Sequence, residues 1–341
     1  MKILLYTDNH FCKQSSIIRG QGQKYSIRLE NQIKSLNWVE RLAEERGVEL
    51  IIHLGDFFDK PSLNAEELTA LKDIQWSDIP HKFIVGNHEI SVNDLRFNSL
   101  NVLDKVGNII STPQLQVLED IYLFYLPYVV EDLREPLNTY LENVPKDKPL
   151  VILSHNDISG IIYGQFESKI GFNIEEIISS CSLFINGHLH NQQQVNEKVL
   201  NLGNLTGQNF SEDATKHSHC VGILNTKTLE IELINNPYAF NFYKLDIESI
   251  QDYKNKEDSL KDNCCLTIKA PQSIIPELKE ELIKNKEIIN FRILGTFEKK
   301  DNTSLVDYHI EKVDHIQQFK EFIINQVQAN ELLMEELQEL C

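Results

Sequence analysis

The chain has 341 residues, of which 51 are acidic and 33 are basic, and its net charge is −18. This length allows a full hydrophobic core and a second, small domain. A strongly acidic chain binds nucleic acid weakly by itself, so either the substrate is small or proteinaceous, or a DNA contact is local and shared with a partner. Apolar runs stay shorter than the roughly 18 residues of a membrane span, and the first residues lead directly into a predicted core strand. We therefore expect a cytoplasmic protein with no membrane contact.

Five short apolar runs in the first two-thirds of the chain predict strands. Continuous runs of this kind are typical of strands that are buried on both faces. In α/β folds, ligand sites gather at the carboxyl ends of such strands. The runs are residues 3–6, 50–54, 83–85, 150–153 and 183–185, and they lead into Asp8, Asp56, Asn87, His155 and Gly187. We expect these five strand ends to lie close together.

The segments between and after these runs complete a two-sheet pattern. Leu29, Ile33 and Leu36 recur at helical spacing between the first two strands. Asn64, with Glu67 three residues later, has the form of a capping box that opens a second helix. Residues 199–202, 221–224 and 229–234 read as strands, and a short turn joins the last two. The predicted fold class is α/β, a two-sheet β-sandwich flanked by helices.

The pattern of predicted elements changes after about residue 237. Strand-like runs at 242–247, 264–269 and 291–294 surround an amphipathic helical pattern over 274–289, which predicts a small α/β module. The adjacent Cys264 and Cys265 lie in a strand, where neighbouring side chains face opposite ways, so we expect reduced, buried thiols and no disulfides.

A third segment follows a polar stretch at 299–304. Ile316, Phe319, Ile323 and Val327 recur at helical spacing, and Leu333, Leu337 and Leu340 follow. No further element remains in the sequence to cover these apolar residues, so they must pack on the body of the chain or on another protein. We therefore divide the chain into domains at 1–236, 237–300 and 301–341.

Five polar motifs close the apolar runs and supply candidate metal ligands. Their side chains are oxygen and nitrogen donors that suit Mn²⁺, Fe²⁺ or Zn²⁺, and none is a cysteine, which argues against a thiolate zinc site. They are too many for one ion and suit two ions that share a carboxylate. The motifs are Asp8-Asn9-His10, Gly55-Asp56-Phe57-Phe58-Asp59, Gly86-Asn87-His88-Glu89, Ser154-His155 and Gly187-His188-Leu189-His190.

In this order the motifs resemble the calcineurin-like metallophosphoesterase superfamily. Each motif alone is a weak signal, since His155 by itself could simply cap a buried strand. All five in sequence, each at the end of a strand, are a strong one. The wider architecture of core, small module and helical tail is similar to the SbcD-type nuclease subunit of break-repair complexes in bacteria and tailed phages. That second resemblance is specific in the core and only architectural beyond it.

The resemblance implies a two-metal phosphodiesterase that acts on DNA as an exonuclease or endonuclease. It implies a role as the nuclease subunit of an SbcCD-type recombination and double-strand-break repair complex. The cofactors would be two divalent ions, Mn²⁺ first, with Mg²⁺, Fe²⁺ or Zn²⁺ as alternatives. The small module would be a capping domain that touches DNA, and the C-terminal helical tail would bind an SbcC-type coiled-coil ABC ATPase. A homodimer would form through helices near residues 64–105.

Carried over to this chain, the resemblance assigns two sets of metal ligands. The first ion would be held by Asp8, His10, Asp56 and His190, and the second by Asp56, Asn87, His155 and His188, so that Asp56 bridges them.

Two further residues receive catalytic roles from the resemblance. His88 would face the scissile phosphate, where it would stabilise charge or protonate the leaving 3′ oxygen. Asp59 would hydrogen-bond His88 and hold its tautomer.

Two departures from the nuclease pattern leave other functions open. Many cellular members have His in place of Asp59 and Asp in place of Glu89, and the form found here is shared with Ser/Thr protein phosphatases. Those phosphatases place an arginine after each of the two motifs to clamp a phosphomonoester, whereas this chain has Lys60 and Ile90. A diester is therefore the better substrate, and a phosphatase is the alternative. A metal-free scaffold that binds DNA or the ATPase ranks last, because every ligand is present.

Residues outside the motifs receive simpler interpretations. The loop from Lys13 to Arg28 carries four basic residues and no acid, and it predicts either a contact with the DNA phosphate backbone or a solvated loop. We expect His53 in the core and His81 exposed. The four basic residues are Lys13, Arg19, Lys24 and Arg28.

Overall fold

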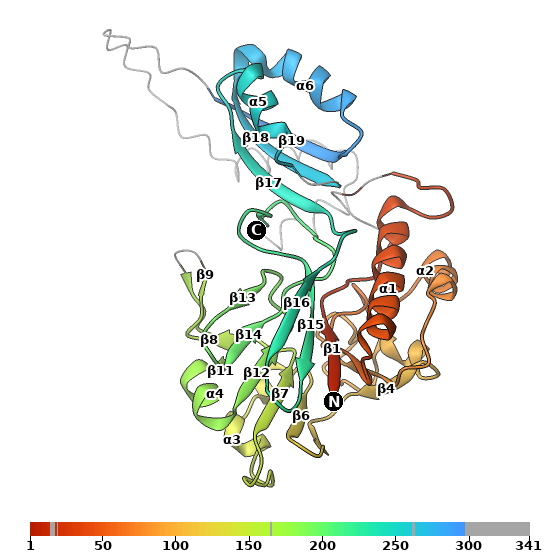
Figure 1. Ribbon diagram of the computed structural model, residues 1–341, viewed down its shortest axis with the longest axis vertical. Helices are drawn as coiled ribbons and strands as arrows, with labels where there is room; N and C mark the ends of the chain where they lie inside the picture. Colours follow the sequence, from red (N-terminus) through yellow and green to blue (C-terminus); the bar gives the residue numbers. More distant parts are fainter. Residues whose placement is uncertain (14–17, 19, 164–165, 261–262, 297–341) are drawn as a thin grey trace, which may run out of the picture. The chain divides into compact units, whose positions relative to one another are not determined.

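Two six-stranded sheets pack face to face in the computed structural model (Figure 1). Across the first sheet lie β16 (Ile231–Asn235), β15 (Cys220–Asn225), β1 (Lys2–Tyr6), β2 (Leu50–His53), β3 (His81–Ile84) and β4 (Gly107–Ile110). Across the second lie β13 (Gln193–Gln194), β14 (Val199–Asn201), β12 (Leu183–Asn186), β7 (Leu150–Ser154), β6 (Tyr122–Leu126) and β5 (Gln114–Val117). The structure describes residues 1–296 except 14–17, 19, 164–165 and 261–262. All of the described residues belong to one compact unit.

The central strands of each sheet are parallel, so their carboxyl ends lie at the same edge of that sheet. Strands β1 to β4 are mutually parallel, as are β6, β7, β12 and β14. The antiparallel pairs lie at the margins, and β16 is an outer strand of the first sheet. The predicted two-sheet sandwich is therefore confirmed, including the hairpin between β15 and β16.

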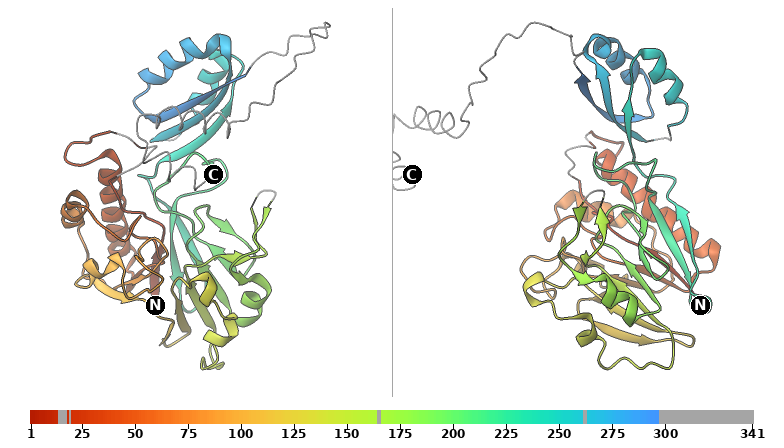
Figure 2. Two further views of the ribbon diagram at one scale, coloured as in Figure 1. Left: turned by 180° about the vertical axis from the view of Figure 1, so that it is seen from behind. Right: turned by 90° about the vertical axis from the view of Figure 1, so that its left-hand side faces the viewer.

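Side chains that alternate along the strands form three hydrophobic layers. The ribbons in Figure 2 show the helices beside the two sheets. Residues such as Ile3, Ile52 and Leu153 fill the space between the two sheets. The outer face of the first sheet packs on α1 (Ile27–Arg46) and α2 (Ala65–Ala70), and that of the second on α3 (Leu137–Tyr140) and α4 (Ile174–Ser180). This burial on both faces is why the strands read as continuous apolar runs.

Local signals set the ends of the first two helices. The Ser26 side chain accepts a hydrogen bond from the Leu29 N–H at the start of α1, and Gly47 ends the helix at a φ of 62°. The predicted capping box of Asn64 and Glu67 opens α2.

Shorter elements connect these layers. The two-residue strands β8 (Ile158–Ser159) and β11 (Phe172–Asn173) pair in parallel, and β9 (Ile162–Tyr163) pairs with β10 (Phe166–Glu167). The 3₁₀ helices are η1 (Leu71–Asp73), η2 (Ser99–Leu103), η3 (Glu131–Leu133) and η4 (Gln272–Ile274).

A separate three-stranded parallel sheet follows the sandwich in sequence. Its strands are β17 (Asn241–Asp246), β18 (Cys264–Pro271) and β19 (Ile288–Thr296), joined by α5 (Ile250–Glu257) and α6 (Ile275–Lys284). Tyr253 of α5 and Leu278 of α6 pack on one face. Phe242 and Cys265 belong to a cluster on the other face, where the ring of Phe210 packs edge-on against that of Phe242. Helix α5 was not predicted, because Tyr253 is its one buried residue and it has no apolar stripe. The domain boundaries stay a prediction, and the tail at 301–341 lies outside the described residues.

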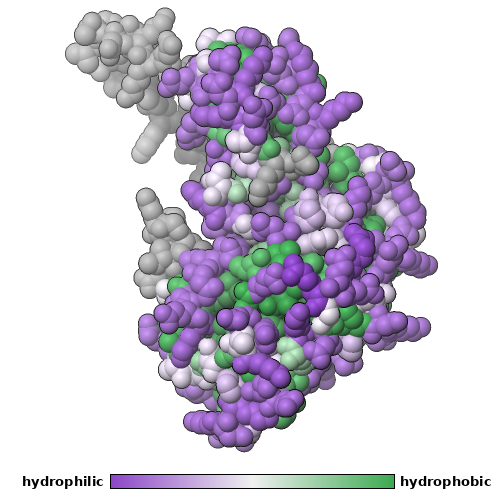
Figure 3. All heavy atoms as spheres, viewed as in Figure 1, coloured by the Kyte–Doolittle hydropathy of each residue, from purple (hydrophilic) through white to green (hydrophobic). Residues whose placement is uncertain are grey.

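The burial of the described cysteines confirms one expectation. Cys12, Cys181, Cys220, Cys264 and Cys265 are buried and form no disulfide. Throughout the part of the chain that the structure describes, the helices are too short or too polar to cross a membrane. Hydrophilic residues cover most of the face shown in Figure 3, as the composition leads one to expect.

Candidate metal centre

The carboxyl ends of five strands bring the predicted ligands into one region. Loops after β1, β2 and β3 come from the first sheet, and loops after β7 and β12 come from the second. Ligand atoms within 4.8 Å of one another form three groups. These are Asp8, His10 and His190; His10, Asp56 and His88; and Asp56, His155 and His188. Two of the groups share Asp56, as a bridging residue requires.

The backbone at this edge is held in an unusual conformation. Six non-glycine residues of the described chain have positive φ angles, and four of them are predicted ligands, namely Asp8, His10, Asp56 and His188. L-residues rarely adopt this conformation, which costs about 1–3 kcal/mol per residue. Hydrogen bonds between the loops support it, including one from the Asp8 N–H to the Gly55 carbonyl at 3.1 Å.

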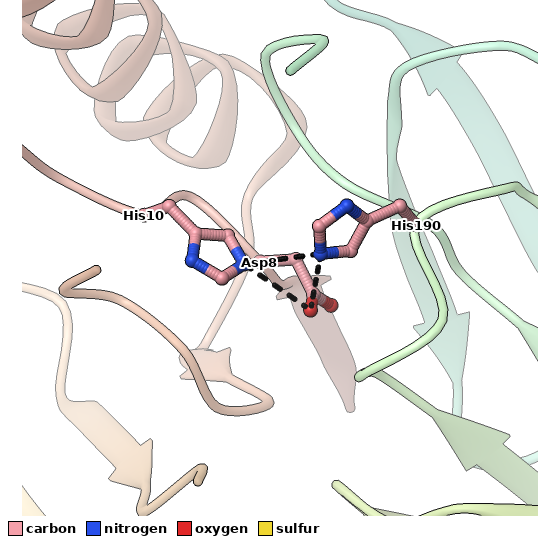
Figure 4. A group of neighbouring side chains, drawn as sticks. All are labelled: Asp8, His10 and His190. Carbon is pink, nitrogen blue, oxygen red and sulfur yellow. Dashed lines mark hydrogen bonds and ion pairs between the residues drawn. The ribbon is translucent and has the colours of Figure 1, made fainter. Parts of the chain in front are cut away.

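The first group joins the loop after β1, from the first sheet, to the loop after β12, from the second (Figure 4). The Nε2 atoms of His10 and His190 are 3.1 Å apart, and each lies 3.8 Å from Asp8 Oδ1. The other carboxylate oxygen, Asp8 Oδ2, accepts hydrogen bonds from Thr7 Oγ1 and the His188 N–H at 2.7 and 2.9 Å. Asp8 Oδ1 is buried and has no hydrogen-bond partner, so it is free to bind a cation.

The second group is built around Asp56. Its Oδ2 lies 3.1 Å from His155 Nε2 and 3.8 Å from His10 Nε2, so this single oxygen faces both groups. Its Oδ1 accepts a hydrogen bond from the His88 N–H at 2.9 Å. Nearby, His188 Nδ1 lies 3.0 Å from Asn87 Oδ1.

The contact of the other ring nitrogen of His155, Nδ1, indicates that this set of donors fits a cation. Its Nδ1 lies 2.8 Å from the Leu54 carbonyl and must donate to it, so a neutral ring leaves a lone pair on Nε2. That lone pair faces a carboxylate oxygen and has no hydrogen-bond partner. Two acceptors at this distance need a proton or a cation between them. The oxygen and nitrogen donors present fit two divalent ions.

In the metal-free protein, protons take the place of the cations. Burial lowers the pKa of His10, but Asp59, Asp8 and Asp56 outweigh burial and raise it to about 10. Burial likewise lowers the pKa of His155, and Asp56 raises it to about 9. Burial raises the pKa of Asp56, yet the surrounding histidines hold it well below its usual range. Metal ions must therefore displace protons when they bind.

His88 and Asp59 differ from the predicted arrangement. His88 Nδ1 lies 2.9 Å from the backbone carbonyl of Asp59, whereas the Asp59 carboxylate lies 3.2 Å from His10 Nδ1. The prediction that the Asp59 side chain holds His88 is therefore wrong. The reason is the pairing of Phe11 with Phe58, which brings the loop after β1 alongside the loop after β2 and places Asp59 beside His10.

Glu89 has a structural role that the sequence interpretation missed. Its buried carboxylate accepts hydrogen bonds from the backbone N–H groups of Gly86, Phe58 and Asp56 at 2.8, 2.9 and 3.1 Å. It thereby ties the loop after β3 to the loop after β2. The available signal was the Gly-Asn-His-Glu motif, in which the glutamate was noted only as a departure from the nuclease pattern.

The predicted basic loop is less available than its sequence suggested. Lys13 pairs with Glu66 at 2.5 Å, and Lys24 pairs with Asp73 at 2.6 Å. Arg28 was expected on an exposed loop, but it lies on α1, is buried, and donates to the His10 carbonyl at 3.2 Å. The acidic partners, Glu66 and Asp73, come from α2 and η1, which are distant from the basic loop in sequence. Arg19 lies outside the described residues.

Comparison with protein-family models agrees with this geometry. A family model described as calcineurin-like phosphoesterase matches residues 1–192, a span that contains every predicted ligand. A search of curated proteins finds no match. Among solved structures, the chain is similar to the crystal structure of a dimetal phosphatase from Danio rerio, with 14% identity and a TM-score of 0.41 over 69% of this chain and 98% of that chain. From the family match over more than half of its length, the chain belongs to the calcineurin-like phosphoesterases, which are hydrolases with a dinuclear metal site.

Proposed function

We propose that the chain is a metal-dependent phosphodiesterase that cleaves DNA. We further propose that it acts as the nuclease subunit of an SbcCD-type complex for recombination and double-strand-break repair, with Mn²⁺ as the preferred ion. Family membership supports hydrolysis of a phosphoester. The choice of a diester rests on one observation, the lack of clamping arginines at the two positions where the related phosphatases carry them.

Lys60 and Ile90 occupy those two positions. Lys60 Nζ lies 3.4 Å from the buried Glu67 carboxylate, and Ile90 packs against the hydrophobic layer beneath α1. Two arginines, Arg28 and Arg134, donate instead to the backbone carbonyls of His10 and Val129. Among the described residues, these two positions therefore offer a phosphomonoester dianion no bidentate arginine, whereas a diester carries one charge fewer.

The residues of the chain divide the remaining work. Bound ions would supply an activated water and a clamp on the phosphoryl oxygens. Because its Nδ1 donates to the Asp59 carbonyl, His88 has Nε2 left to act on the leaving 3′ oxygen, as an acid or a charge stabiliser. The Asp59 carboxylate orients His10 through Nδ1.

One face of the three-stranded sheet supports a local DNA contact in spite of the net charge. Lys244, Thr267 and Arg292 are neighbours on adjacent strands, and Lys269 follows on the same face of β18. The Arg292 guanidinium lies over the ring of Phe210 at 4.7 Å from its centroid. Lysines and stacked arginines of this kind suit contact with phosphates and bases.

Partner binding remains part of the proposal. We propose that the tail at 301–341 binds an SbcC-type ATPase, and that a homodimer forms through residues 64–105. The exposed Val92, Phe97 and Val102 in that range support the second idea. Deleting residues 314–341 should leave a folded nuclease that cleaves short single strands with Mn²⁺ but no longer co-purifies with the ATPase. A deletion that unfolds the protein, or that still binds the ATPase, would contradict this assignment.

One experiment separates the candidate functions. The purified protein is incubated with linear duplex DNA, circular single-stranded DNA and a chromogenic phosphomonoester, each with Mn²⁺, Mg²⁺ or EDTA. We expect DNA cleavage with Mn²⁺, none with EDTA and little release of chromophore. A His88→Ala variant, purified identically, controls for contaminating nucleases.

Three other outcomes each contradict the proposal. Turnover of the phosphomonoester without DNA cleavage would make the protein a phosphatase. Hydrolysis of neither substrate by protein that retains two ions would exclude both assigned substrates. A protein that binds no metal would be a scaffold.

A further inference from the structure

A carboxylate outside the predicted ligand set contacts the second metal group. Asp157 Oδ1 lies 3.2 Å from Nε2 of His188, whose Nδ1 faces Asn87 Oδ1 at 3.0 Å. Asp157 belongs to none of the three ligand groups formed by the described residues. The Asp157 carboxylate therefore contacts the imidazole ring of a predicted ligand, His188.

A buried hydrogen-bond network fixes Asp157 relative to His188. The Asn156 N–H donates to Asn186 Oδ1 at 3.2 Å, and Asn186 Nδ2 donates back to the Asn156 carbonyl at 2.9 Å. Both asparagines are completely buried. Since Asn156 precedes Asp157 and Asn186 ends β12, this reciprocal pair sets the distance between the loops that carry the carboxylate and the imidazole.

A second contact holds the backbone of Asp157. Its carbonyl accepts a hydrogen bond from the Phe172 N–H at 3.0 Å. Gly171, at a φ of 103°, packs so closely that an added Cβ would lie 2.1 Å from the Asp157 carbonyl group. The position of Asp157 is thus built by the fold, although its side chain is still 22% exposed.

We propose that Asp157 is a positioning residue that orients His188 toward the second metal ion. A carboxylate only accepts hydrogen bonds, so Asp157 selects the tautomer of His188 with the proton on Nε2. The lone pair on Nδ1 then faces Asn87 Oδ1, another acceptor, and a cation between them satisfies both atoms. Asp157 does for His188 what the Leu54 carbonyl does for His155. The inference rests on the dinuclear site of the family and not on DNA as substrate.

The test measures metal binding directly. Mn²⁺ is titrated into the metal-free full-length protein by calorimetry, and electron paramagnetic resonance distinguishes isolated ions from a spin-coupled pair. In Asp157→Ala we expect one of the two equivalents to bind about 10–100-fold more weakly and the spectrum to show isolated Mn²⁺. Asp157→Asn should lose less, because its amide oxygen still accepts from Nε2–H. The melting temperature of each metal-free variant checks its fold.

Matched variants separate positioning from loss of charge. Asp147→Ala removes an exposed carboxylate whose partner is the Tyr122 hydroxyl, and it should bind both equivalents as the unmodified chain does. Asp59→Ala should weaken the equivalent that includes His10. Unchanged binding of both equivalents in Asp157→Ala, or an equal loss of both, would overturn the inference. If the alanine variant does not fold, Asp157→Leu, which is of similar size but accepts no hydrogen bond, takes its place, and unchanged binding in that variant overturns the inference. Failure to cleave DNA would bear on the proposed function and leave this result standing.

Discussion

Parallel strands end in loops in both the sandwich and the three-stranded sheet, but the polar residues at those ends differ. In the sandwich, Asp8, His10 and Asp56 are buried and have positive φ angles. In the small sheet, Asp246 ends β17 with a side chain that is 80% exposed and has an ordinary backbone conformation. The same strand arrangement therefore does not by itself make a site. The sandwich holds charged groups in strained positions, at a cost to stability that bound metal offsets.

We expect the largest effect from removing the carboxylate charge that the two metal groups share. Asp56→Asn should abolish hydrolysis and weaken both ions, because one oxygen of Asp56 faces both groups. His10→Ala should mainly weaken the first ion. Elemental analysis together with turnover measurements checks both variants. Two tightly held ions and near-normal turnover in Asp56→Asn would remove the bridging role.

A second variant separates chemistry from metal binding. His88→Ala should keep both ions and lower turnover about 10²–10⁴-fold, the usual contribution of a positioned acid or charge stabiliser. Asp59→Asn should cost less, since it keeps the carbonyl that holds His88 and changes only the contact with His10. Single-turnover kinetics at saturating Mn²⁺ tests both. Unchanged kinetics in His88→Ala would assign the leaving group to another residue.

Acid should oppose metal binding at the sandwich edge. The pKa of metal-free His10 is raised to about 10 and that of His155 to about 9, so both rings are protonated at pH 7. Binding of the two ions should release about two protons, one at each site, so the affinity for each ion should rise about 10-fold per pH unit between pH 6 and 8. In the metal-free protein, the stabilisation from these pairs is complete below pH 6.5 and is lost as the pH rises through 9 to 10. Calorimetry in buffers of different ionisation enthalpy counts the protons, and release of none would contradict the assigned contacts.

We expect the smallest effect from changing Glu89, which joins the loop after β3 to the loop after β2. Glu89→Gln should destabilise the protein by about 1–3 kcal/mol, because an amide cannot accept from all three backbone N–H groups in the same way. Urea denaturation of the metal-free protein measures the change. Glu175→Gln, an exposed residue in the first turn of α4, is the control and should be neutral. Equal stability of both variants would show that Glu89 does not tie the loops.

The sequence predicted those features that depend on local pattern. Burial on both faces produced the apolar runs of the central strands, and helical spacing located α1. The motifs placed every predicted ligand near the others, because the carboxyl ends of parallel strands coincide.

Contacts between distant segments could not be predicted in this way. His81 was expected to be exposed, but it is buried against the Glu40 carboxylate at 3.0 Å. Asp59 turned out to face His10, and Asp157 was missed because nothing in its own segment shows that a histidine 31 residues later lies beside it. Which group a single side chain contacts depends on how the loops of the two sheets pack against each other.

The placement of β1 has a consequence for how the protein is made. This strand lies between β2 and β15, so one of its two neighbours is synthesised only when residue 225 has been added. The contact between His10 and His190 likewise joins residues 180 positions apart. At about 5–20 residues per second, the ribosome needs roughly 10–40 s to cover that distance. Until His155 has been added, the nascent chain carries the four predicted ligands from Asp8 to Asn87 without the three histidines that complete the two sets.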